Sequence, residues 1–113
     1  MTAPAPIERR PLLATPLKDW RTTKVDVRAI RFGPGQVTGV HVHPCQVIGY
    51  IAAGAAILEI EGQPARRLET GAAFHEPAAA RILRFDNASR EEPLEFVATY
   101  LLQGDQPLIE MLE

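Results

Sequence analysis

The stretch that decides the fold reads Gly35-Gln36-Val37-Thr38-Gly39-Val40-His41-Val42-His43-Pro44. It follows a turn at Gly33 and Pro34, and most of its residues are small or β-prone. Side chains two residues apart on a strand point to the same face. We therefore expect His41 and His43 to direct their imidazoles at one place, which begins either a metal site or a polar pocket.

The rest of the chain reads as short strands separated by glycine and proline turns. We expect strands over residues 25–32, 37–43, 47–52, 56–61, 66–69, 72–76, 82–85 and 94–102. In the first of them the apolar side chains change phase, which predicts a bulge near Ala29. Helical periodicity is weak throughout. Many short strands at regular spacing are typical of an all-β sandwich or barrel.

Composition and charge limit the classes of function, partner and cellular location that we expect. The 113 residues are enough for one domain, with 46% hydrophobic and 23% charged residues. The formal net charge of -2 and the scattered arginines predict neither a nucleic-acid partner nor a membrane partner. The single cysteine, Cys45, excludes an intrachain disulfide and fits a reducing compartment. Since no apolar run suits a bilayer span or a secretion signal, we expect a cytoplasmic protein.

Three regions follow from these patterns. Residues 1–24 are expected to form an N-terminal arm or edge strand, and 12–20 is the part that would pair or wrap onto a neighbour. Residues 25–103 are expected to form the barrel. Residues 104–113 are expected to be a C-terminal tail, in which 107–113 makes either one helical turn or a further strand.

The order of motifs resembles that of the cupins. Gly35, five residues, His41-Val42-His43, and then Gly49-Tyr50-Ile51 and Gly54 resemble the first cupin motif. Gly71, five residues, Pro77 and later Asn87 resemble the second. The resemblance is to small single-domain members of the RmlC-like cupin superfamily. It implies a jelly-roll barrel, or double-stranded β-helix, with a pocket inside and often a homodimer.

The same resemblance shows where this chain departs from metal-binding cupins. In those proteins the first motif supplies two histidines and a carboxylate, and the second motif supplies a third histidine. His41 and His43 match the first pair, whereas the carboxylate position falls at Val47 and the third histidine position at Ile82. The glycine usual after the proline turn falls at Ala79. The resemblance therefore implies a metal site that is degenerate or incomplete.

Neighbouring side chains offer other donors. Gln46 adjoins Val47, and His75 and Glu76 should lie on opposite faces of one strand, so that one of them faces the barrel. A set of two histidines and a carboxylate suits ferrous iron, and zinc, manganese and nickel are the other divalent candidates. The competing interpretations are a rim position for His75 and an ion pair of Glu76 with Arg81 or Arg84. Without metal, two adjacent imidazoles should lower the pKa of at least one of them.

Two functions compete at this point. The first is a barrel that binds a small molecule without catalysis, because both replaced ligand positions are apolar. Its pocket would be formed by His41, His43, Val47, Gly49, Ile51, Ile82 and Arg84. The second is a metal-dependent enzyme, an oxygenase or isomerase of a small organic substrate, that uses His41 and His43 as ligands. In either case we expect a small-molecule ligand and a homodimer.

Overall fold

The computed structural model describes residues 2–112, and over that range the chain forms nine β-strands and no helix. The strands are β1 (Lys24–Phe32), β2 (His41–Val42), β3 (Gln46–Ala53), β4 (Ala56–Ile60), β5 (Arg66–Leu68), β6 (Ala73–Glu76), β7 (Ile82–Asn87), β8 (Leu94–Leu102) and β9 (Glu110–Met111). The described residues accordingly hold no helix with the length and apolar character of a membrane span.

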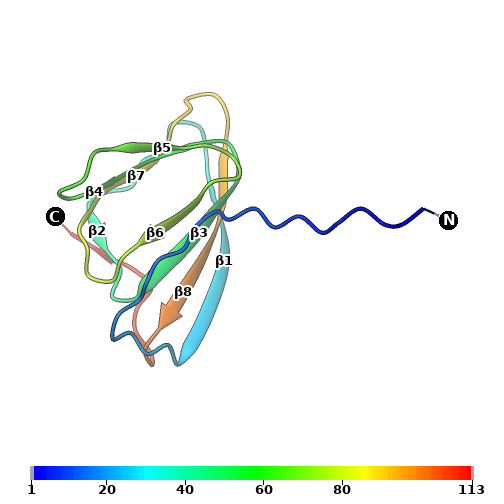
Figure 1. The fold of residues 1–113 in the computed structure, drawn as a ribbon. Coiled ribbons are helices and arrows are strands. Elements are labelled where there is room, and N and C mark those ends of the chain that lie inside the picture. Colours follow the sequence, from blue (N-terminus) through cyan, green and yellow to red (C-terminus); the bar gives the residue numbers. More distant parts are fainter. Residues whose placement is uncertain (1, 113) are drawn as a thin grey trace.

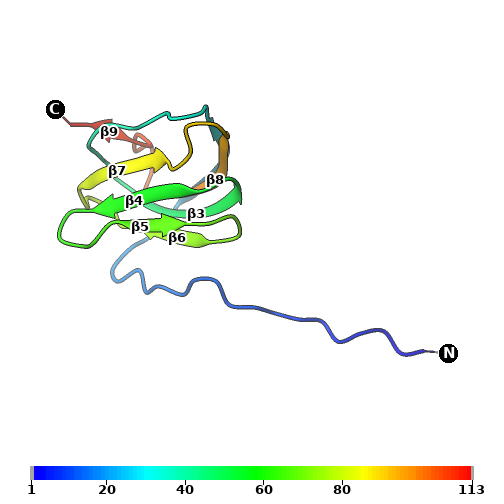
Figure 2. The ribbon, with the colours of Figure 1, turned by 90° about the horizontal axis from the view of Figure 1, so that it is seen from above.

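The strands form two antiparallel sheets that face each other (Figure 1). One sheet has the order β1-β8-β3-β6 and the other the order β5-β4-β7-β2-β9. Seen from above, β9 lies beyond β7 at the end of the molecule that carries the C-terminus (Figure 2). This is the jelly-roll, or double-stranded β-helix, architecture, and the prediction of an all-β barrel is confirmed.

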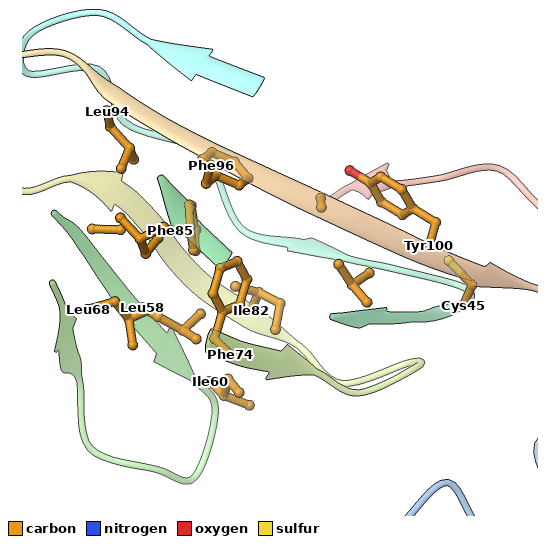
Figure 3. Close-up of a cluster of buried hydrophobic side chains, with 14 of the residues drawn as sticks. Cys45, Leu58, Ile60, Leu68, Phe74, Ile82, Phe85, Leu94, Phe96 and Tyr100 are labelled. Carbon is orange, nitrogen blue, oxygen red and sulfur yellow. The ribbon is translucent and has the colours of Figure 1, made fainter. Parts of the chain in front are cut away.

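The core lies between the sheets (Figure 3). Strand β8 alternates buried with less buried positions along its whole length, so one of its faces fills the core. The buried positions are Leu94, Phe96, Ala98, Tyr100 and Leu102. Phe96 also packs against Phe74 and Phe85, with ring centroids 6.3 and 4.7 Å away. Contacts of this kind between aromatic rings stabilise the barrel beyond the area that they bury.

Two local expectations were wrong. The expected bulge near Ala29 is absent, because β1 pairs with β8 in continuous register. The valines that suggested a phase change, Val25 and Val27, lie on the outer face with exposures of 55% and 61%. The expected strand at 37–43 shortens to β2, because Thr38 forms side-chain bonds across the sheet instead of strand pairs. Its hydroxyl accepts from the Phe85 amide, and its amide donates to Asp86.

The two ends of the chain behave differently. Residues 12–20 form no strand, and the chain before them extends away from the barrel (Figures 1 and 2). Trp20 ties this arm to the barrel, since its indole donates to the Leu101 carbonyl at 3.0 Å. Within residues 104–113, β9 pairs with β2, and residue 113 lies outside the described residues. The strand alternative for this segment is therefore the one observed.

Candidate metal centre and cavity

The two histidines face the interior between the sheets. His41 lies on β2 opposite Ile82 of β7, and His43 follows just after the strand. Their side chains are almost fully buried, and their ring centroids are 5.0 Å apart. The spacing of two residues thus brings both imidazoles to one face, as strand geometry requires.

Backbone carbonyls fix the orientation of both rings. The Nδ1 atom of His41 lies 2.9 Å from the Gly39 carbonyl oxygen, and that of His43 lies 2.7 Å from the Leu108 carbonyl oxygen. A carbonyl oxygen only accepts, so each Nδ1 carries a proton and each Nε2 is the remaining nitrogen. Histidines that bind metals are held in this way by a bond to the other ring nitrogen.

Glu76 supplies a carboxylate at the same place. It comes from β6, where it is the cross-strand partner of Val47 on β3, and its side chain is buried. One carboxylate oxygen, Oε2, lies 2.6 Å from His43 Nε2 and 3.9 Å from His41 Nε2. Cross-strand partners have neighbouring Cβ atoms. The carboxylate that the cupin resemblance would place at Val47 is therefore provided by the residue directly opposite.

Charge and burial act against each other in this cluster. Burial opposes protonation of His41, but the nearby Glu76 carboxylate and the hydrogen bond to the Gly39 carbonyl outweigh burial and raise its pKa. Burial also favours neutral Glu76, yet the short contact with His43 and the charges of both histidines hold the pKa of its carboxyl below the usual value. At His41 the carboxylate thus reverses the lowering of the pKa that was expected for at least one of the two histidines.

The donor chemistry fits a divalent metal ion. The ligand atoms of His41, His43 and Glu76 lie within 4.8 Å of one another, and no other group of this kind occurs in residues 2–112. Donors that bind one ion at about 2.1 Å are about 3.0 to 3.4 Å apart, so side-chain adjustments alone would suffice. Two neutral imidazoles and a carboxylate are donors for zinc and ferrous iron.

Gln46 and His75, the other two candidate ligands, lie away from this cluster. His75 Nε2 donates to Gln46 Oε1 at 2.7 Å, and the same oxygen accepts from the Ala78 amide at 3.2 Å. The remaining ring nitrogen of His75 lies 3.3 Å from the Thr15 hydroxyl. Since His75 and Glu76 are adjacent on β6, they point to opposite faces of the sheet. The structure therefore uses His75 to hold the arm.

A cavity of about 260 Å³ adjoins the cluster. Most of its wall is apolar and aromatic, and its lining residues are Ile30, Phe32, Thr38, His41, His43, Val47, Phe74, Glu76, Phe85, Phe96, Ala98, Tyr100 and Ile109. Tyr100 adds a hydroxyl, and its ring centroid lies 5.9 Å from that of His43. Burial, together with the nearby Glu76 carboxylate, raises the pKa of Tyr100 to about 12, so this hydroxyl is protonated at neutral pH.

Four residues expected in the pocket do not line this cavity. Gly49 lies against Phe74, whose ring occupies the space of a side chain there, and Ile51 and Ile82 are packed in the core. Arg84 is partly exposed and paired with Asp86 at 2.9 Å. Three lining residues, Tyr100, Phe74 and Phe85, were not predicted from the sequence, although the alternation along β8 was a signal for Tyr100.

Comparison with known proteins agrees with this architecture. A family model described as a cupin domain matches residues 29–100, and the chain belongs to the cupin domain family. No curated protein sequence matches the chain significantly.

Solved structures share the fold at low sequence identity. The DMSP lyase DddQ from Ruegeria pomeroyi DSS-3 matches with a TM-score of 0.67 and 21% identity over 77% of this chain and 42% of its own. A cupin-like protein from Thermotoga maritima matches with a TM-score of 0.64 and 26% identity over 78% and 64%. A double-stranded β-helix protein from Klebsiella pneumoniae matches with a TM-score of 0.66 and 22% identity over 84% and 80%. The chain thus spans less than half the length of the DMSP lyase.

Proposed function

We propose that this cupin barrel binds a divalent metal ion through His41, His43 and Glu76 and uses it as an enzyme that acts on a small organic molecule. The observation that carries the proposal is the convergence of the three buried ligand groups on one point at the wall of the cavity. Catalytic metal sites keep three protein ligands and leave a further position open for substrate. The bound ion would act there as a Lewis acid or redox centre.

The chain's own residues prepare the site for this role. The Gly39 and Leu108 carbonyls hold the two imidazoles in the tautomer whose Nε2 can bind a metal. Glu76 is kept ionised by its neighbours despite its burial. The surrounding phenylalanines exclude water and lower the local dielectric, which strengthens electrostatic interactions with a substrate.

Metal uptake by matched variants tests the proposal. We would equilibrate the protein with zinc or, without oxygen, with ferrous iron, remove the excess, and determine the metal content. We expect about one ion per chain in the wild type and less than about a tenth of that in Glu76→Gln and His41→Ala, because each variant loses a ligand. The matched control is His75→Ala, which removes a neighbouring histidine outside the cluster. Equal metal content in all four proteins would overturn the proposal.

The second candidate function is metal-free binding of a small apolar molecule. The observation in its favour is the direct contact of 2.6 Å between His43 Nε2 and Glu76 Oε2, where one shared proton would satisfy both groups without a metal. Val47 also gives the cavity an apolar wall at an expected ligand position. Thermal denaturation of chelator-treated protein distinguishes the two functions, because only this candidate predicts a ligand-induced shift that persists in excess chelator.

We also propose a homodimer formed through β1. This strand is an edge of its sheet, and its outer face carries the exposed Val25 and Val27. Antiparallel pairing of two β1 strands centred on Val27 would set Asp26 of each copy opposite Arg28 of the other. The same register packs Val27 of one copy beside Val27 of the other and satisfies the open edge, which isolated proteins otherwise protect with charges or bulges.

For the location in the cell we propose the cytoplasm. The support is the single cysteine, Cys45, which is fully buried and makes no disulfide. Free buried thiols are typical of reducing compartments. Fractionation of the source cells, with the protein followed by an antibody, tests this location, and recovery in an extracellular or periplasmic fraction would contradict it.

A further inference from the structure

The cavity has one polar end and one apolar end. At the polar end lie His41, His43 and Glu76, and the ring centroid of Tyr100 is 5.9 Å from that of His43. Tyr100 also lines the cavity, and its hydroxyl is protonated at neutral pH. It is therefore available to donate to a ligand. In Figure 3 it points away from Cys45, along β8 towards the side where Phe96 lies.

The apolar end is a wall of aromatic rings. Phe85 and Phe96 have ring centroids 4.7 Å apart, and Phe74 lies 5.1 Å from Phe85. A cavity of about 150 Å³ with an apolar lining is known to hold benzene. The volume of about 260 Å³ observed here therefore holds a body of that size together with a small polar head.

The charges around the cavity limit the ligand to one negative group. No lysine or arginine is among the lining residues. The nearby Arg28 is 57% exposed and already paired with Asp26. A divalent ion held by two neutral imidazoles and one carboxylate leaves one net positive charge. A second carboxylate on the ligand would then lie against phenylalanine rings without a counter-charge, which is costly.

From these three observations we infer that the ligand is a small monocarboxylic acid with an apolar body about the size of a benzene ring. This inference rests on the proposed function. The single carboxylate lies at the end with the metal ligands and accepts a hydrogen bond from Tyr100. The body lies among Phe74, Phe85 and Phe96. Tyr100 is thus the residue that selects the carboxylate head, and the aromatic wall selects the body.

Calorimetric titration of the zinc-loaded protein with benzoate tests the inference. Three compounds serve as comparisons: acetate lacks the body, benzyl alcohol lacks the charge, and phthalate carries a second carboxylate. We expect benzoate to bind at least about tenfold more tightly than each of them, because each lacks a favourable contact or buries an unpaired charge. Acetate or phthalate binding as tightly as benzoate, or no benzoate binding to the zinc-loaded protein, would overturn the inference.

Variants separate the roles of head and body. Ala98→Leu fills the cavity from β8, so we expect benzoate affinity to fall at least about tenfold while acetate affinity stays unchanged. Tyr100→Phe should lower the affinity for both acids about tenfold, because it removes a hydrogen bond to a charged group and leaves the ring in place. Thr99→Leu, on the other face of β8, is the matched control and should alter neither. If Ala98→Leu lowered the affinity for benzoate and for acetate equally, the placement of the apolar body among the aromatic rings would be contradicted.

The zinc content of each sample distinguishes this inference from the proposed function. A wild type that takes up no zinc overturns both. A wild type that takes up one zinc per chain but does not discriminate among the four compounds overturns only the ligand class. Comparison of the compounds on the wild type remains decisive if Ala98→Leu fails to fold.

Discussion

At the scale of single residues, the backbone decides what His41 and His43 can do. The carbonyls of Gly39 and Leu108 orient both rings, so that each Nε2 faces Glu76. In the metal-free protein the same arrangement gathers an ionised carboxylate and a histidine that readily takes a proton. The stability of this form should therefore depend on pH in a way that the metal removes.

The metal-free protein should be most stable in mildly acidic solution. The pKa of Glu76 is lowered, so its contribution is present above the ordinary value of 4.5 and is lost as pH falls through the lower folded value. The pKa of His41 is raised, so its contribution is present below the ordinary value of 6.5 and is lost as pH rises through the higher folded value. Urea denaturation with chelator should give a maximal free energy of unfolding between about pH 4.5 and 6.5.

The control for this prediction is Glu76→Gln, which removes the charge that favours His41 protonation. Its free energy of unfolding should fall less steeply above about pH 6.5 than that of the wild type. If the two proteins lose stability in parallel over that range, the pairing of His41 with Glu76 does not govern the pH dependence.

Ala79 carries local strain beside the site. Its φ is 64°, a left-handed conformation that favours glycine, and its amide donates to the His43 carbonyl at 2.8 Å. Ala79→Gly should therefore raise the free energy of unfolding by about 1 kcal/mol, which corresponds to about 4 °C in Tm. Differential scanning calorimetry measures the shift. A lower Tm would mean that the greater freedom of unfolded glycine outweighs the relieved strain.

Sequence reasoning at this scale could pair His41 with His43 but could not choose between His75 and Glu76. The spacing of two residues fixes a common face for the histidines without further information. Which of the adjacent residues on β6 faces inward depends on its register with β3, where Val47 lies opposite Glu76. That pairing joins segments 29 residues apart, and local sequence patterns do not encode it.

At the scale of the strands, Gly49 allows the aromatic wall to form. A Cβ atom at this position would lie 2.0 Å from the Phe74 ring, which rests directly on the backbone of β3. Gly49→Ala should lower the free energy of unfolding by about 3 kcal/mol, because the ring must leave its place. Urea denaturation measures the loss.

The control is Gly33→Ala, where the new Cβ would meet only Gln36 Oε1, at 3.9 Å and at the end of a flexible side chain. This change should stay within about 0.5 kcal/mol of the wild type. Similar losses in both variants would show that the Phe74 contact is not the cause.

The strands also show which patterns can be predicted locally. The bounds of β8, Leu94–Leu102, match the expected strand because its alternation is continuous. The segment before β2 is β-prone, yet Thr38 pairs through its side chain with β7, and only His41 and Val42 form the strand. Such side-chain bonds depend on distant partners, so sequence periodicity could not reveal them.

At the scale of the whole molecule, the β1 edge predicts a dimer that depends on charge. Sedimentation should give a mass of about twice the 12.4 kDa of one chain. Arg28→Asp should dissociate the dimer, because it sets like charges opposite each other across the two copies of β1. The combined Asp26→Arg and Arg28→Asp variant should restore it. Arg31 lies outside the charge pair, so Arg31→Asp should leave the dimer intact.

The C-terminal segment contributes to the site in ways that could not be predicted from the sequence. The bond that orients His43 comes from the Leu108 carbonyl, 65 residues further along the chain, and Ile109 lines the cavity. A backbone carbonyl in a tail gives no signal in the sequence. The barrel and the histidine pair followed from local patterns and from the cupin resemblance, whereas the third ligand and the cavity wall required the folded structure.

Anomalous diffraction from a crystal of the protein grown with cobalt tests the proposed metal site most directly. We predict one strong anomalous peak, from an ion bonded to Nε2 of His41, Nε2 of His43 and a carboxylate oxygen of Glu76 at about 2.1 Å from each. A well-ordered cluster with no peak, or a peak bound instead by His75 and Gln46, would contradict it.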